Sequence, residues 1–251
     1  MSVHRGHLAE FLGMMDAPPA HITGHTTMMI TLPSALNALQ LQDVRNMLRH
    51  ASFVNGKLSA GSAASRVKNN QEVAPNAPEL DALNNVVMNS LVQHPIYRAA
   101  ALPLRVAAPY YARYIPGMHY GEHVDDPIMG VDGMPYRCDV AITVFLSNVE
   151  DYDGGELAVR TSLGTQLIKL PGGDAILYPA SSLHQVMPVM RGERLVAVTW
   201  LQSAVRDPAQ RELLYELNLA REKLLLAAPD APETAQVNRS YVNLVRMWSN
   251  V

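Results

Sequence analysis

The stretch RLVAVTWLQS (residues 194–203) places apolar residues at alternating and adjacent positions after a leading arginine, which is typical of a strand with at least one buried face. Gly, Pro, Asp and Asn separate it from similar short runs earlier in the chain. These runs are RVAAPYYARYIPG (105–117), CDVAITVFLSNV (138–149), GGELAVRT (154–161), TQLIKLPGG (165–173) and DAILYP (174–179). Short β-rich runs at such spacing predict a β-sandwich or barrel.

Helical patterns flank this β-rich region on its N-terminal side. Apolar residues recur at helical spacing over 34–50, with Ser34 as the expected N-cap. The stretch SFVNGKLSAG (52–61) predicts a strand, an Asn-Gly turn and a second strand. A second helix is expected from about residue 80, ending before Pro95. These helices are available to cover one face of a sheet.

The chain becomes helical again in the segment 206–251. Asp207 is a suitable N-cap, and Pro208 suits the first helical position. Near the C-terminus one apolar stripe repeats at helical spacing, formed by Val237, Tyr241, Leu244, Val245 and Trp248. We therefore expect helices that bury one face, either as a cap on the barrel or in a homo-oligomer.

Composition narrows the class of protein. Hydrophobic residues make up 48% of the 251 residues, the net charge is −3, and Lys and Arg form no run, so neither a nucleic-acid nor a membrane partner is expected. The single Cys138 cannot form an internal disulfide, which favours a cytoplasmic location. No secretory leader or membrane span is expected, and residues 1–27 are predicted to be a flexible tail.

The stretch MHYGEHVDDP (118–127) contains an unusual concentration of imidazoles and carboxylates. It is compatible with a solvated loop, a general acid/base pair or half of a metal site. Its glycine and flanking prolines argue against a helix. In an extended chain His123 and Asp125 project to the same side, where both could reach one cation. Three-residue patterns of this kind are common by chance, so a further ligand must come from elsewhere.

His184, in LYPASSLHQVMP, is the only histidine after residue 125. It lies between two short apolar runs, where a lone histidine is more often structural. Together with His123 and Asp125, however, it gives two imidazoles and one carboxylate, the facial set associated with non-heme Fe(II) oxygenases. A closed structural zinc site would need four ligands, usually including cysteines.

Arg194, ten positions after His184, begins the quoted strand. It is either a surface arginine paired with Glu193 or a guanidinium fork that binds a substrate carboxylate. Tyr114 could add a hydroxyl to the same pocket if its strand lies beside that of Arg194. Trp200 falls on the same strand face, as a wall of the cavity or as part of the core.

These residues resemble the Fe(II)/2-oxoglutarate dioxygenases, and the bacterial PKHD-type hydroxylases of the prolyl-4-hydroxylase-like branch in particular. The resemblance runs from about Met28 to the C-terminus. Besides the HxD pair, His184 and Arg194, it rests on RVKNNQEV (66–73), RCDVAITVFLS (137–147), YDGGELAV (152–159) and the stretch 170–207.

The resemblance implies a mainly β fold with flanking helices, a double-stranded β-helix or distorted jelly roll. It implies a dioxygenase domain over 28–205, followed by the helical segment 206–251. It makes His123, Asp125 and His184 the Fe(II) ligands. It makes Arg194, with Tyr114, the binding residues for 2-oxoglutarate.

The implied activity is hydroxylation coupled to oxidative decarboxylation of 2-oxoglutarate, with dioxygen as co-substrate and ascorbate as reductant. The hydroxylated substrate, a peptide or a small molecule, stays open. Two alternatives remain at this stage: a sensor that binds iron and 2-oxoglutarate without turnover, and a cupin-type metalloenzyme. A cupin would normally have a closely spaced HxH pair followed by Glu, where this chain has HVD. The role of Lys68–Gln71 is open between a substrate-side lining and a plain turn.

Overall fold

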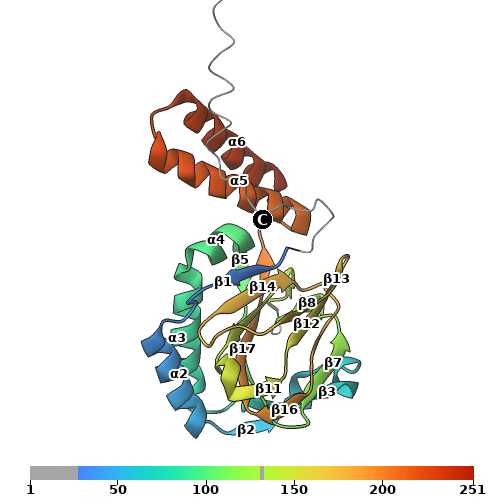
Figure 1. Ribbon diagram of the computed structural model, residues 1–251. Coiled ribbons are helices and arrows are strands. Elements are labelled where there is room, and N and C mark those ends of the chain that lie inside the picture. Colours follow the sequence, from blue (N-terminus) through green and yellow to red (C-terminus); the bar gives the residue numbers. More distant parts are fainter. Residues whose placement is uncertain (1–27, 131–132) are drawn as a thin grey trace, which may run out of the picture.

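The computed structural model of the chain describes residues 28–130 and 133–251 (Figure 1); the prediction for residues 1–27 falls outside them. An eight-stranded antiparallel sheet forms one wall. Its order is β1 (Ile30–Leu32), β14 (Ala175–Pro179), β10 (Val140–Phe145), β17 (Arg194–Ser203), β6 (Tyr110–Tyr114), β4 (Gln71–Val73) and β2 (Phe53–Asn55), with β5 (Pro103–Val106) also paired to β17.

A five-stranded sheet forms the other wall, in the order β13 (Gly164–Ile168), β12 (Leu157–Thr161), β15 (His184–Val186), β7 (His119–His123) and β3 (Lys68–Asn69). Two two-stranded sheets complete the described strands: β8 (Ile128–Met129) with β9 (Tyr136–Arg137), and β11 (Tyr152–Gly154) with β16 (Val189–Gly192). Each of the predicted β-rich runs contains a strand, so the prediction of a mainly β fold with flanking helices is confirmed.

Side-chain alternation in the large sheet separates two apolar layers. In β10, Val140, Ile142 and Val144 pack outward with the helices, whereas Ala141 and Phe145 join the layer between the two sheets. The outer layer is covered by α2 (Ala38–His50) and α3 (Leu80–Gln93), which lie along the large sheet in Figure 1. The inner face of the sheet is thus left to face the small sheet.

The first helix begins later than predicted. Asn37, not Ser34, is its N-cap: the Asn37 side chain accepts a hydrogen bond from the amide of Gln40, and the Gln40 side chain accepts one from the amide of Asn37. Ser34 instead has a positive φ of 52°, and its amide donates to Asp174. The prediction of Ser34 as the cap was therefore wrong, because a reciprocal capping box lies three residues further on.

The Asn-Gly pair does not form the predicted hairpin turn. Gly56–Ser59 is a 3₁₀ helix, and β2 pairs with β4 rather than with the residues that directly follow it. Gly56 contacts Asn70 closely: its amide donates to the Asn70 carbonyl, and a Cβ at this position would lie 2.0 Å from Asn70 Oδ1. The glycine therefore permits a close contact between distant segments rather than a tight turn.

The second helix ends before Pro95 as predicted, but Pro95 begins a further helix that the sequence pattern did not reveal, α4 (Pro95–Ala101). At the C-terminus, α5 (Pro208–Ala227) has Asp207 as its N-cap and Pro208 at its start, as predicted. It forms a hairpin with α6 (Pro232–Trp248) that projects from one end of the barrel (Figure 1). No helix in the described part of the chain is long and apolar enough to cross a membrane.

Gly192 provides a stability test for the turn that leads into β17. It has a φ of 74°, and a Cβ there would lie 1.9 Å from the carbonyl oxygen of Asp151. Gly164 also has a positive φ, but a Cβ there meets nothing within 4 Å. Gly192→Ala should lower the free energy of unfolding by about 2 kcal/mol more than Gly164→Ala, because only the first adds a backbone clash to the strain. Urea denaturation of both variants measures this, and equal losses would contradict it.

Candidate metal centre

Strand pairing brings together two histidines that are far apart in the sequence. β7 pairs antiparallel with β15, and His123 lies directly opposite His184 in this register. Their ring centroids are 4.2 Å apart. The prediction that His184 lies near the HxD pair therefore follows from one strand pair in the small sheet.

Asp125 lies two residues beyond the end of β7 and completes the group. Its Oδ1 is 4.0 Å from His123 Nε2 and 3.8 Å from His184 Nε2. The intervening Val124 is 50% exposed, so the chain turns this side chain outward and the two polar ones inward. One ligand atom from each of the three residues lies within 4.8 Å of the others, which is close enough to hold one ion.

Backbone carbonyls fix the orientation of both imidazoles. His123 Nδ1 lies 2.8 Å from the carbonyl oxygen of Gly121, and His184 Nδ1 lies 3.0 Å from that of Ser182. If each Nδ1–H donates to its carbonyl, each Nε2 keeps its lone pair for a metal. Burial, helped by the neighbouring His184, lowers the pKa of His123 to about 4, so this ring is neutral at neutral pH.

The carboxylate has unused binding capacity. Burial raises the pKa of Asp125, an effect that His184 opposes. Its Oδ2 atom is buried and has no hydrogen-bond partner among the described residues. A buried carboxylate oxygen without a hydrogen-bond partner is unfavourable unless a cation compensates it. Two imidazoles and one such carboxylate fit a divalent first-row metal.

Arg194 is buried in the same interior, at 1% exposure, which excludes the interpretation as a surface arginine paired with Glu193. Glu193 instead lies 3.9 Å from Arg113. The Nε and Nη1 atoms of Arg194 have no hydrogen-bond partner among the described residues. A buried guanidinium with free donors is suited to a carboxylate ligand, which it can bind through two parallel hydrogen bonds.

Tyr114 lies directly opposite Arg194 in the pairing of β6 with β17. The Arg194 guanidinium lies 5.1 Å from the centre of the Tyr114 ring. Gly155, at a φ of 67°, makes room for the arginine, because a Cβ there would lie 3.1 Å from Arg194 Cδ. The sequence-based condition for Tyr114, a strand beside that of Arg194, is met.

Aromatic side chains that the sequence did not single out connect these groups. Tyr178 is buried, and its ring centre lies 5.2 Å from that of His184. Burial and the nearby Asp125 raise the pKa of Tyr178, and Thr143 and Arg194 oppose part of this rise. Tyr120 stacks on His123 with ring centres 3.6 Å apart. Side chains alternate along the strand in DAILYP, and Ile176 and Tyr178 both belong to the inner apolar layer. This alternation could have identified Tyr178 as a residue that faces the interior.

Trp200, which was ambiguous in the sequence, lies beside the carboxylate. Trp200 lowers the pKa of Asp125 against the larger effect of burial, and its ring packs edge-on against Tyr110, with ring centres 5.8 Å apart. It forms part of the wall around the three candidate ligands. Glu122 and His119 do not join the three candidate ligands: Glu122 pairs with Arg160 on the surface, and His119 Nδ1 faces the Gly117 carbonyl.

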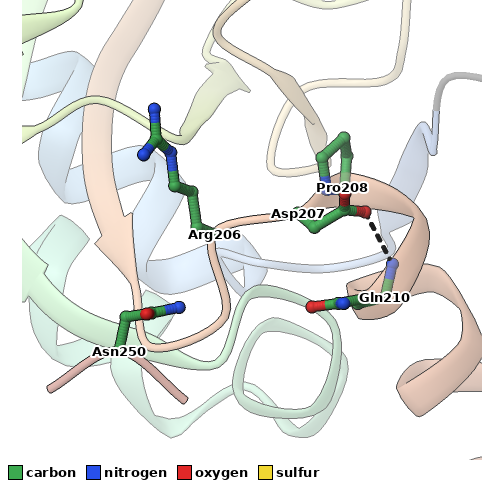
Figure 2. A pocket seen from close by; sticks show the side chains of 5 residues that line it. All are labelled: Arg206, Asp207, Pro208, Gln210 and Asn250. Atoms are coloured by element: carbon green, nitrogen blue, oxygen red, sulfur yellow. Dashed lines mark hydrogen bonds between the residues drawn. The ribbon is translucent and has the colours of Figure 1, made fainter. Parts of the chain in front are cut away.

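A separate concave surface lies where β17 leads into α5, with a volume of about 360 Å³ (Figure 2). It is lined by Arg206, Asp207, Pro208, Gln210 and Asn250 and shares no residue with the candidate metal centre. The Asp207 carboxylate already accepts hydrogen bonds from the amides of Ala209 and Gln210, one of which is drawn in Figure 2. Asp207 in this surface therefore serves as the N-cap of α5.

Comparison with known proteins shows which family the chain matches. Residues 109–202, which contain His123, Asp125, His184, Arg194 and Tyr114, match the family model of the 2OG-Fe(II) oxygenase superfamily. Residues 208–250 match the PKHD-type hydroxylase C-terminal domain. A 2OG-Fe(II) oxygenase family protein from Burkholderia pseudomallei has the same fold, with a TM-score of 0.51 at 16% identity over 69% of this chain and 85% of that one. The double-stranded β-helix prediction is thereby confirmed.

Two relatives extend the match to most of the chain. A PKHD-type hydroxylase from Thioalkalivibrio sulfidiphilus is 50% identical over 224 residues, covering 89% of this chain and all of the relative. One from Hyphomonas neptunium is 43% identical, with the same coverage. The chain belongs to the PKHD-type hydroxylases. It is therefore a non-heme iron, 2-oxoglutarate-dependent dioxygenase, and the cupin-type alternative no longer applies.

The thiol of Cys138 offers a test of how enclosed this interior is. Burial raises the pKa of Cys138 well above its usual value, with smaller contributions from Asp125 and Asp139. Because the thiolate is the reactive form, iodoacetamide at pH 8.5 should modify the folded protein at least about tenfold more slowly than the urea-unfolded chain. Cys138 is the only cysteine, so a single mass increment reports the reaction. Equal rates in the two states would contradict the shift.

Proposed function

We propose that the chain is a hydroxylase that holds Fe(II) through His123, Asp125 and His184 and binds the distal carboxylate of 2-oxoglutarate through Arg194. The observation that carries this proposal is Arg194 itself, because a buried guanidinium with free donors shares one interior with a group of three potential metal ligands. The distal carboxylate of the keto acid would supply the anionic partner that Arg194 lacks among the described residues.

Bound iron and 2-oxoglutarate would supply the oxidising chemistry, coupling decarboxylation of the keto acid to insertion of a hydroxyl group. The chain's own residues would orient the reactants. The carbonyls of Gly121 and Ser182 hold the two imidazoles in one orientation. Arg194 would fix the far end of the keto acid, with the Tyr114 ring against it. Trp200 and Tyr178 would limit access of water to the reacting centre.

Three finer parts of the proposal concern the hydroxylated substrate, the reductant and the location. The substrate is a peptide or a small molecule. Ascorbate is proposed as the reductant that maintains Fe(II). The cytoplasm is proposed as the compartment, because the single Cys138 has no disulfide partner in this chain.

A sensor that binds iron and 2-oxoglutarate without turnover is the alternative to a hydroxylase. Succinate formation in the presence of oxygen separates the two.

His184→Ala tests the iron ligands. Anaerobic titration of the apo-protein with Fe(II) and then 2-oxoglutarate should give a visible charge-transfer band in the wild type and none in this variant, because one of the three ligands is lost. Oxygen-dependent succinate formation should be lost as well. Full activity in His184→Ala would show that the ligand assignment is wrong.

Arg194→Ala tests the keto-acid anchor in the same titration. The band should still form, but the 2-oxoglutarate concentration for half-saturation should rise roughly a hundredfold, because truncating one partner of a buried charge pair costs several kcal/mol. Arg191→Ala is the matched control, since Arg191 lies three residues earlier and pairs with Asp153 on the surface. A similar half-saturation in wild type and Arg194→Ala would place the keto acid elsewhere.

A further inference from the structure

One short segment belongs to both walls of the barrel. β3 pairs with β7 in the small sheet, and β4 pairs with β6 in the large sheet. Only Asn70 separates β3 from β4, and it is buried. The segment is therefore neither a plain turn nor an ordinary strand, because it connects the sheet that carries His123 to the sheet that carries Arg194.

A buried ion pair spans this crossing. Lys68 Nζ, on β3, lies 2.5 Å from Glu72 Oε1, on β4, and both residues are 7% exposed. Ser59 donates to the other Glu72 oxygen at 2.6 Å and accepts from Lys68 at 2.9 Å. Buried ion pairs are weak sources of net stability, because desolvation opposes their attraction. A defined geometry is a better-supported reason for such a pair than stability.

The lysine of the pair lies next to a residue that contacts a candidate metal ligand. Lys68 lies directly opposite Tyr120 in the pairing of β3 with β7. Its ammonium nitrogen is 5.3 Å from the centre of the Tyr120 ring, which in turn stacks on His123 at 3.6 Å with only 13° between the planes. The position of this ammonium is thus coupled by contact to that of the His123 ring.

The glutamate end reaches the other wall. Glu72 lies opposite Ala112 in the pairing of β4 with β6. Tyr114, two residues along β6, projects to the same face as Ala112, and both belong to the inner apolar layer. Tyr114 lies opposite Arg194. One ion pair therefore links the neighbours of His123 to the neighbours of Arg194.

We propose that the Lys68–Glu72 ion pair is a positioning element that sets the spacing between the iron ligands and Arg194. This inference rests on the proposed function, in which 2-oxoglutarate contacts both. The keto acid can span only a limited distance, so the spacing decides how well its two ends can bind at once. A keto acid that lacks the distal carboxylate, such as pyruvate, binds only at the metal end and does not depend on the spacing.

The test compares 2-oxoglutarate with pyruvate as ligands of the Fe(II)-loaded protein under anaerobic conditions. The measured quantity is the ratio of their half-saturation concentrations, read from the charge-transfer band. In Lys68→Met, half-saturation by 2-oxoglutarate should rise about tenfold while that by pyruvate stays within about twofold. Lys68→Arg, which keeps the ion pair, should recover most of the ratio. Arg160→Met, which breaks the exposed pair between Arg160 and Glu122 on β7, is the control and should behave as wild type.

Lys68→Met leaves Glu72 buried and unpaired, so this variant could fail to fold. The double variant Lys68→Met/Glu72→Met removes both charges and keeps the inference testable. A lowered preference for 2-oxoglutarate in the double variant, at an unchanged melting temperature, supports the positioning role. An unchanged ratio, or an equal loss for both keto acids, overturns it. A wild-type protein that forms no band overturns the proposed function together with this inference, whereas a wild-type band with unaltered variants overturns the inference alone.

Discussion

The interior of the barrel depends on the alternation of side chains along the central strand β17, which pairs with β10, β6 and β5. Its inward positions are Arg194, Val196, Val198 and Trp200. Its outward positions include Ala197 and Leu201, which pack under the helices. A shift of one residue in the pairing would place the arginine among the helices and expose their apolar faces to a polar group. Core packing and the site are therefore set by the same register.

The small sheet imposes a second constraint of the same kind. His123 and His184 meet only because β7 and β15 pair in one register, with an irregularity between His184 and Val186. The carbonyl that orients each ring lies two residues earlier in the chain, at Gly121 within β7 and at Ser182 just before β15. The two sheets thus contribute different groups to one interior: the small sheet carries the potential iron ligands, and the large sheet carries Arg194, the proposed partner of the keto-acid carboxylate.

The sequence was most informative where residue type and periodicity acted together. His184 stood out because no other histidine follows residue 125, and Arg194 because it begins a strongly apolar strand. The Asn-Gly signal at 55–56 failed because Gly56 serves a contact with Asn70, which depends on how distant strands pair. The roles of Tyr178 and of the Lys68–Glu72 pair were inaccessible for the same reason, since each depends on neighbours that only the folded sheets bring together.

Two buried cations in the barrel, Lys68 and Arg194, differ in whether the protein itself supplies their hydrogen-bond partners. Lys68 and Arg194 are both at least nine-tenths buried, so each carries a substantial desolvation cost. Lys68 has that cost offset within the protein, by Glu72 and Ser59. Arg194 has two donor nitrogens without any partner in the described part of the chain. A cation that is already paired is suited to holding structure in place. A buried cation with free donors is suited to binding a carboxylate, so at Arg194 the desolvation cost is coupled to the proposed binding of the keto acid.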